Sequence, residues 1–122
     1  MSAVVLIVED NPRNLKLVRD VLEYAGFVVL SADEGEAGIE LARARRPDLI
    51  LMDVHLPGID GVEALARLRA DGATAAIPVV ALTAYAMKED RARFEAAGFD
   101  GYLEKPVNVR ELPGQVEALL RR

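Results

Sequence analysis

The chain has 122 residues, 52% of them hydrophobic and 29% charged, with a formal net charge of -5 at pH 7 and no cysteine. This length suits one domain over residues 1–122, and this composition supports a buried core rather than a disordered chain. The acidic balance disfavours direct nucleic-acid binding, and the lack of cysteine excludes disulfides and thiolate metal sites. No apolar run is long enough to cross a bilayer and no signal peptide is visible, so we expect a cytoplasmic domain without a membrane partner.

Five short apolar runs along the chain predict β-strands. They are Val4–Val8, Phe27–Leu30, the run that ends at Asp53, Ile77–Thr83 and Gly101–Glu104. Segments with apolar residues at helical spacing separate these runs and follow the last one. Five strands alternating with five helices predict an α/β fold, a doubly wound parallel sheet with helices on both faces and right-handed crossovers.

Several predicted helices carry capping signals at their first residues. The clearest signals are Asn11-Pro12, Asp33–Glu36, Asp60 and Asn108–Glu111. Gly26 and Gly98 are placed to end the first and the fourth helix. In the last helix Pro113 removes a backbone hydrogen bond and Gly114 weakens the next turn, so we expect an irregular or delayed start there.

The apolar positions of each predicted helix indicate which side faces the core. The expected inward residues are Leu15, Val18, Leu22 and Ala25 in the first helix, Ala37, Leu41 and Ala44 in the second, Val62, Leu65 and Leu68 in the third, and Val116, Leu119 and Leu120 in the last. The helix predicted at Lys88–Ala97 has a thin apolar stripe, formed by Met87, Phe94 and Ala97. A helix with so little apolar surface is expected to be loosely held.

Polar and charged side chains stand at the carboxyl ends of four predicted strands. Glu9 and Asp10 follow the first strand, Asp53 ends the third, Thr83 ends the fourth and precedes Ala84, and Lys105 follows the fifth. In a doubly wound sheet these ends converge on one crevice, where ligands bind. Three carboxylates brought together need a cation, and oxygen ligands favour Mg²⁺. A hydroxyl and an ammonium opposite them suit phosphoryl oxygens, so the set describes an aspartate that accepts a phosphoryl group.

Each of these residues also has a simpler interpretation when it is considered alone. Glu9 and Asp10 could serve a helix N-terminus, Thr83 could cap the next helix, and Lys105 could be a surface lysine. Their placement at successive strand ends favours one joint site over these separate interpretations. The single histidine, His55, follows Asp53 by two residues. We expect its backbone carbonyl, rather than its side chain, to face the metal.

The motifs around these residues resemble the response-regulator receiver domain of two-component signalling over essentially the whole chain. The matching stretches are Val8–Asn11, Leu51–Gly61, Ala81–Ala84 and Lys105-Pro106. The resemblance implies a flavodoxin-like sheet in the order 2-1-3-4-5 and a cis peptide bond between Lys105 and Pro106. It also implies phosphorelay signalling by a stand-alone receiver that is not an enzyme.

The same resemblance implies a role for each residue at the strand ends. The implied roles are Asp53 as the phosphoacceptor, Asp10, Asp53 and the His55 backbone carbonyl as direct Mg²⁺ ligands, Glu9 as a ligand through water, Thr83, the Ala84 amide and Lys105 as contacts to the phosphoryl oxygens, and Thr83 with Tyr102 as the switch.

The resemblance also implies protein partners. A histidine kinase or a histidine phosphotransfer protein would supply the phosphoryl group, and a downstream protein would bind the Lys88–Ala97 helix, the last strand and the last helix. His55 and Tyr85 flank the site and are expected to tune the lifetime of the phosphoaspartate. Pro113-Gly114 departs from the usual last helix of the family, which puts the usual partner geometry in question but not the chemistry.

Two other functions are open to an α/β chain with an aspartate at a strand end. An Asp-nucleophile, Mg²⁺-dependent phosphatase of the haloacid dehalogenase type would have a second aspartate where this chain has His55, and its nucleophile would follow the first strand. A flavin binder would need a phosphate-cradling loop after the first strand, where Glu9 and Asp10 would repel the flavin phosphate. Steady turnover of a generic phosphatase substrate would favour the phosphatase, whereas one stoichiometric transfer would favour the receiver.

Overall fold

The computed structural model describes residues 2–84 and 88–121 as a parallel sheet with surrounding helices. The elements in chain order are β1 (Val4–Val8), α1 (Pro12–Tyr24), β2 (Val28–Ala32), α2 (Gly35–Arg45), β3 (Leu49–Asp53), α3 (Gly61–Ala70), β4 (Val79–Thr83), α4 (Lys88–Ala97), β5 (Gly101–Glu104) and α5 (Leu112–Leu120). The strands are all parallel and lie in the order β2-β1-β3-β4-β5. The predicted fold class and strand order are therefore confirmed.

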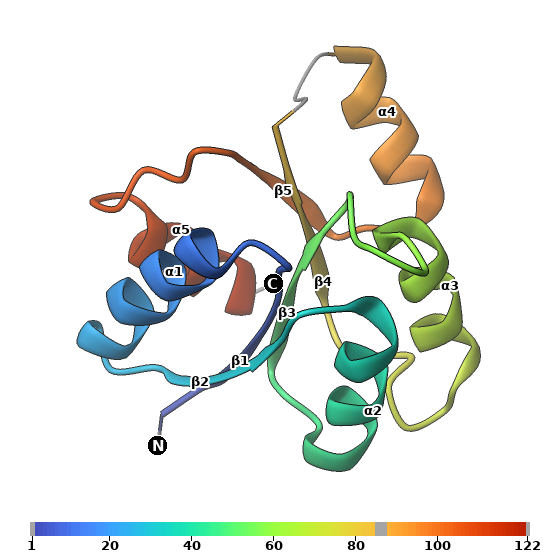
Figure 1. The fold of residues 1–122 in the computed structure, drawn as a ribbon, viewed down its shortest axis with the longest axis horizontal. Helices are drawn as coiled ribbons and strands as arrows, with labels where there is room; N and C mark the ends of the chain where they lie inside the picture. The colour runs from blue at the N-terminus through green and yellow to red at the C-terminus, as the bar shows by residue number, and fades with distance from the viewer. Residues whose placement is uncertain (1, 85–87, 122) are drawn as a thin grey trace.

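Helices cover both faces of the sheet (Figure 1). α1 and α5 lie on one face, and α2, α3 and α4 lie on the other. Side chains alternate along each strand, so Val5 and Ile7 of β1 join the apolar cluster under α1 and α5, whereas Leu6 and Val8 join the opposite cluster. β3 lies in the middle of the sheet and is buried along its whole length. Asp53, its last residue, is therefore central on the carboxyl edge.

The predicted helix ends are mostly confirmed. Asn11 caps α1 by accepting hydrogen bonds from two backbone amides of the first turn, and Pro12 is the first helical residue. Asp60 caps α3 in the same way. Gly26 and Gly98 adopt positive φ angles of 99° and 105° directly after α1 and α4, a conformation that ends a helix at little cost for glycine.

α2 differs from the prediction at its start and on its buried face. Its N-cap is Glu34, which makes no capping hydrogen bond through its side chain, so the predicted capping box at 33–36 is wrong. Its buried residues are Gly35, Gly38, Ile39 and Ala42. Of the predicted inward residues, Leu41 is half-buried and packs against the core as expected, Ala37 is half-buried, and Ala44 is exposed. The physical reason is close approach, because a Cβ atom on Gly38 would lie 2.7 Å from Cγ2 of Val8. A stripe built only from larger apolar residues misses such a glycine face.

Two other inward predictions fail, and three strand ends move. Val62 is 37% exposed, since Gly61 and Ala64 take the inward positions of α3, and Ala25 is exposed after α1. β2 starts one residue later and ends two later than predicted, because the amide of Phe27 closes the turn after α1. β4 starts at Val79 because the preceding residues close the turn that follows α3.

The start of α5 is delayed, as predicted. Asn108 accepts hydrogen bonds from the amides of Arg110 and Glu111, but the helix begins only at Leu112, with Pro113 in its first turn. α4 spans the predicted residues and buries Phe94. Met87, part of the stripe predicted for that helix, lies outside the described residues.

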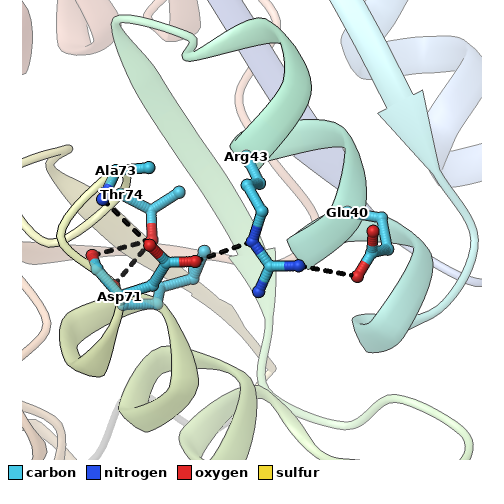
Figure 2. A network of polar contacts seen from close by, with 6 residues as sticks. Glu40, Arg43, Asp71, Ala73 and Thr74 are labelled. Atoms are coloured by element: carbon cyan, nitrogen blue, oxygen red, sulfur yellow. Dashed lines mark hydrogen bonds and ion pairs between the residues drawn. The ribbon is translucent and has the colours of Figure 1, made fainter.

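Two polar networks hold the helices on the α2–α4 side. Arg43 of α2 bonds Glu40 and Asp71, and Asp71 also accepts a hydrogen bond from the amide of Ala73 (Figure 2). Arg69 of α3 makes the second network, in which its guanidinium donates to the carbonyls of Ala75, Ile77 and Gly98 and to the carboxylate of Asp100. Across the described residues, no helix has both the length and the apolar character that a bilayer span requires.

Candidate functional site

Asp53 occupies the centre of the carboxyl edge with both of its oxygens held. β3 ends at this residue, which is almost fully buried, at 4% exposure. Oδ1 accepts a hydrogen bond from the His55 amide at 3.0 Å, and Oδ2 accepts one from Lys105 Nζ at 2.8 Å. A carboxylate fixed by a backbone amide on one side and an ammonium on the other presents a defined face to a reactant.

Glu9, at the end of β1, is the second buried carboxylate of the site. Oε2 accepts a hydrogen bond from the Asn11 amide at 3.3 Å, and Oε1 lies 2.6 Å from Lys105 Nζ. The direction of that second contact falls outside hydrogen-bond geometry, so Oε1 is buried without a hydrogen-bond partner. The ion pair with Lys105 is therefore the contact that offsets the burial of this oxygen.

The buried charges change one another's pKa values. Burial, and after it the neighbouring Asp53 carboxylate, raises the pKa of Glu9 from its ordinary 4.5 to about 7. Burial acts to raise the pKa of Asp53 as well, but its hydrogen bonds with Glu9, Lys105 and the His55 amide outweigh burial and hold that pKa below its usual value. Burial opposes the charge on Lys105, yet its contacts with Asp53 and Glu9 outweigh burial and raise its pKa. The pair of carboxylates therefore favours a state with one proton and one negative charge.

The geometry of the acidic residues fits a small cation. One carboxylate oxygen each from Glu9, Asp10 and Asp53 lies within 4.8 Å of the others, and Asp10 is exposed to solvent. Oxygen ligands of this kind, open to water on one side, suit Mg²⁺ better than a transition metal. The backbone of His55 is tied to this cluster through its bond to Asp53.

Thr83 and Lys105 reach the same edge from neighbouring strands. Thr83 is the last residue of β4 and is buried, and Ala84 after it is exposed. The amide of Lys105 donates to the Thr83 carbonyl at 2.8 Å, which continues the ladder between β4 and β5 beyond Glu104. The peptide bond between Lys105 and Pro106 is cis, as predicted. Glu9, Asp10, Asp53 and Lys105 are thus brought together, and Thr83 is joined to them through its backbone bond to Lys105.

Tyr102 lies on β5 away from this edge and is half-buried. The guanidinium of Arg91 stands 4.9 Å from the centroid of its ring. Both residues line a hollow of about 400 Å³ whose wall comes from α4, β5 and α5. Tyr85, expected beside the phosphoacceptor, lies outside the described residues.

One residue at the site has a structural importance that the sequence analysis did not find. Gly61 starts α3, and a Cβ atom there would lie 2.5 Å from the backbone oxygen of Asp53. The signal was a glycine at the first helical position, directly after the Asp60 cap. Sequence spacing alone does not show which backbone that glycine approaches.

Comparison with known sequences identifies the class of protein. Residues 5–117 match the response regulator receiver domain. Because the match covers most of the chain, the chain belongs to this family, and its function is phosphorelay signal transduction. The haloacid dehalogenase alternative finds no support in these comparisons.

Individual relatives agree with this assignment. The chain is 44% identical over 109 residues to the polar-differentiation response regulator DivK of Brucella anthropi, which is 89% of each chain. The chemotaxis response regulator CheY4 of Vibrio cholerae has a TM-score of 0.92 at 28% identity, with 98% of this chain and 99% of that one covered. The receiver domain of the sensor histidine kinase PA1611 from Pseudomonas aeruginosa has a TM-score of 0.90 at 34% identity over both full chains, and in that structure a magnesium ion is coordinated in the active site cleft.

Proposed function

We propose that residues 1–122 act as a receiver domain that accepts a phosphoryl group on Asp53 from a histidine kinase or a phosphotransfer protein in the cytoplasm. The observation that carries this proposal is the setting of Asp53, a buried carboxylate held between the His55 amide and Lys105. The chain transfers one phosphoryl group to itself and does not turn over a substrate as an enzyme does. It has no membrane or nucleic-acid partner in this proposal.

In the proposed reaction one Oδ atom of Asp53 attacks the phosphorus of the donor. The bond from phosphorus to the donor's imidazole nitrogen, or to the leaving oxygen of an acyl phosphate, breaks, and its electron pair leaves with the donor. Lys105, Thr83 and the Ala84 amide hold the phosphoryl oxygens. The Asp53 carboxylate loses its negative charge when it becomes an acyl phosphate, so Lys105 exchanges its ion pair with Asp53 for one with the phosphoryl group. Positioning and charge neutralisation carry most of the catalysis in such transfers.

The acidic cluster supports a magnesium requirement. Asp10, Asp53 and the His55 carbonyl would hold Mg²⁺ directly, and Glu9 would hold it through water. The bound ion would neutralise negative charge on the phosphoryl oxygens. The support comes from the three clustered carboxylates of Glu9, Asp10 and Asp53 and from the magnesium ion coordinated in the related PA1611 receiver domain.

The output surface in this proposal comprises α4, β5 and α5, with Thr83 and Tyr102 as the switch. Phosphorylation places an anion near Thr83, and movement there frees space beside β4 for the ring of Tyr102. The half-buried ring and the hollow of about 400 Å³ beside it support this assignment, since a side chain at such a boundary can turn without leaving a packed core. A phosphoryl group shifts this equilibrium only as far as it binds the two states differently.

Phosphorylation by acetyl phosphate tests the phosphoacceptor. With Mg²⁺ present, intact-mass spectrometry should show one phosphoryl group on the wild-type chain and none on Asp53→Asn. Asp48→Asn is the matched control, because Asp48 lies on the amino side of β3 and bonds the Val4 amide instead. Labelling of Asp53→Asn at the wild-type rate would contradict the assignment.

Backbone NMR with beryllofluoride tests the output surface. The shift changes should extend from Asp53 to Tyr102 and into α4, and Thr83→Ala should weaken that extension while leaving Asp53 open to phosphorylation. Shift changes confined to the surroundings of Asp53 in the wild-type chain would show that the proposed output surface is wrong.

A further inference from the structure

We infer that Gly61 is a positioning residue for the phosphoacceptor. Only a residue without a side chain allows the start of α3 to pack directly against the backbone of Asp53. The inference rests on the proposed function, in which Asp53 accepts the phosphoryl group, and it adds a residue that does not touch the reactants. Three contacts around Val54, the residue that follows Asp53, carry it.

The first contact is the approach of α3 itself. A Cβ atom on Gly61 would lie 2.5 Å from the Asp53 backbone oxygen and 2.9 Å from Val54 Cα. Both atoms belong to the main chain, so no rotation of a side chain can relieve the overlap. Gly61 does not have a positive φ angle, so its role here is to leave space and not to adopt a special conformation.

The second and third contacts hold Val54 through the two peptide groups on either side of it. The amide of Gly61 donates to the Val54 carbonyl at 2.9 Å, and the amide of Val54 donates to the Leu82 carbonyl of β4 at 3.1 Å. Val54 is therefore fixed between a strand and a helix start. A methyl group on Gly61 must either push the backbone of Asp53 and Val54 away from β4 or lift the start of α3 away from β3.

Either displacement reaches the reactive carboxylate. The next residue, His55, donates its amide to Asp53 Oδ1, so movement of the chain from Asp53 to His55 changes the direction of that carboxylate. Displacing α3 instead shifts the segment from Val54 to Asp60, in which the proposed metal-binding carbonyl of His55 lies. Misplacement of reacting groups by about 1 Å can slow a reaction by about 10²-fold.

NMR of Gly61→Ala tests this inference without any phosphorylation. The amide resonance of His55 and the carboxylate resonance of Asp53 should move, and the His55 amide should exchange with solvent faster. Leu68→Ala, a cavity two turns along the same helix, controls for lost stability, and Gly72→Ala, where a Cβ would meet nothing within 4 Å, controls for the substitution itself. Wild-type resonances for His55 and Asp53 in Gly61→Ala would overturn the inference.

Acetyl phosphate labelling then tests the consequence for the reaction. Gly61→Ala should be labelled at least about tenfold more slowly than wild type at saturating Mg²⁺, while the two control variants keep the wild-type rate. Equal rates in Gly61→Ala and wild type would overturn the inference even if the resonances move. A wild-type chain that is never labelled on Asp53 would instead overturn the proposed function, and the NMR result would still decide the positioning.

A measurement on the wild-type chain covers the case in which Gly61→Ala does not fold. Coupling through the hydrogen bond between the Gly61 amide nitrogen and the Val54 carbonyl carbon should be detectable. The presence of this coupling supports the contact of α3 with Val54. Its absence in a well-resolved spectrum would overturn the inference.

Discussion

At the amino ends of β4 and β5, Arg69 meets Asp100, whereas at the carboxyl ends of β1 and β3, Lys105 meets Glu9 and Asp53. Arg69 has three carbonyls and one carboxylate as acceptors, and Asp100 Oδ2 also accepts from the Val79 amide at 2.8 Å. Both charges at this amino edge therefore have several partners. They are also partly exposed, which lowers the desolvation cost.

The carboxyl edge has the opposite arrangement. One ammonium serves two buried carboxylates, and one oxygen of Glu9 has no hydrogen-bond partner. The same pairing of opposite charges can therefore stabilise a fold at one edge of the sheet and hold a site ready for a cation at the other. The number of acceptors and donors around each pair decides which of these it does.

Arg69→Met should have the largest effect on stability. The substitution leaves three carbonyls and the Asp100 carboxylate without their donor, so we expect the free energy of unfolding to fall by about 3 kcal/mol. Urea denaturation measures this. Labelling of Asp53 by acetyl phosphate should keep its wild-type rate, because the amino edge is remote from the site.

Arg67→Met is the matched control for that change. Arg67 lies on the same helix, but it is half exposed and its ion-pair distances to Glu36 and Glu63 are 3.8 and 3.5 Å. It should lose far less stability. Equal losses of unfolding free energy in the two variants would show that the Arg69 network contributes no more to stability than an exposed ion pair.

Glu9→Gln should have an intermediate effect that depends on pH. The pKa of Glu9 is raised to about 7 in the folded chain, so between its ordinary value and about 7 the folded chain keeps a proton that the unfolded chain has released. The stabilisation is complete below the ordinary pKa and is lost as pH rises through about 7. We expect a wild-type decline of about 3 kcal/mol across this range without Mg²⁺, and a much flatter profile in Glu9→Gln.

Urea denaturation at a series of pH values in the presence of a chelator measures both profiles. The lowered pKa of Asp53 acts in the opposite sense and at lower pH, since its stabilisation is lost only as pH falls through the folded value. An identical decline in wild type and Glu9→Gln would show that Glu9 is not the titrating group.

Arg43→Ala should have the smallest effect of the three. The pair that Arg43 forms with Asp71 is short, at 2.6 Å, but both groups are reached by water (Figure 2). We expect a drop in the melting temperature well below that of Arg69→Met, and the drop should shrink further in high salt. A drop as large as that of Arg69→Met would mean that hydrogen-bond number does not separate strong from weak networks in this domain.

The fold could be predicted from the sequence because the strands are short, apolar and regularly separated. The buried face of α2 could not, since Gly35 and Gly38 contribute close approach and no apolar surface. Val62 failed for a related reason, because Gly61 and Ala64 pack inward at the start of α3. Patterns of large apolar residues find helices well but place small residues on the wrong side.

The members of the site could be predicted from their positions at strand ends, and their convergence on one edge is confirmed. Their roles stay predictions. The raised pKa of Glu9 and the packing of Gly61 against the Asp53 backbone could not be predicted, because both depend on how closely two segments approach in space. The capping signal at Asn108 was real but belonged to a turn before α5, where Pro113 delays the helix.

The contact between Lys105 and Asp53 spans 52 residues of sequence and depends on β5, a strand at the edge of the sheet that pairs with β4. The site is therefore completed only when the last strand docks, late in any order of assembly in which β1, β3 and β4 come together first. If β5 detaches, Glu9 and Asp53 remain buried without an ammonium, and they must then share a proton or admit water. On this basis a partly folded chain would be unable to take up a phosphoryl group, and completely folded molecules alone would be phosphorylated.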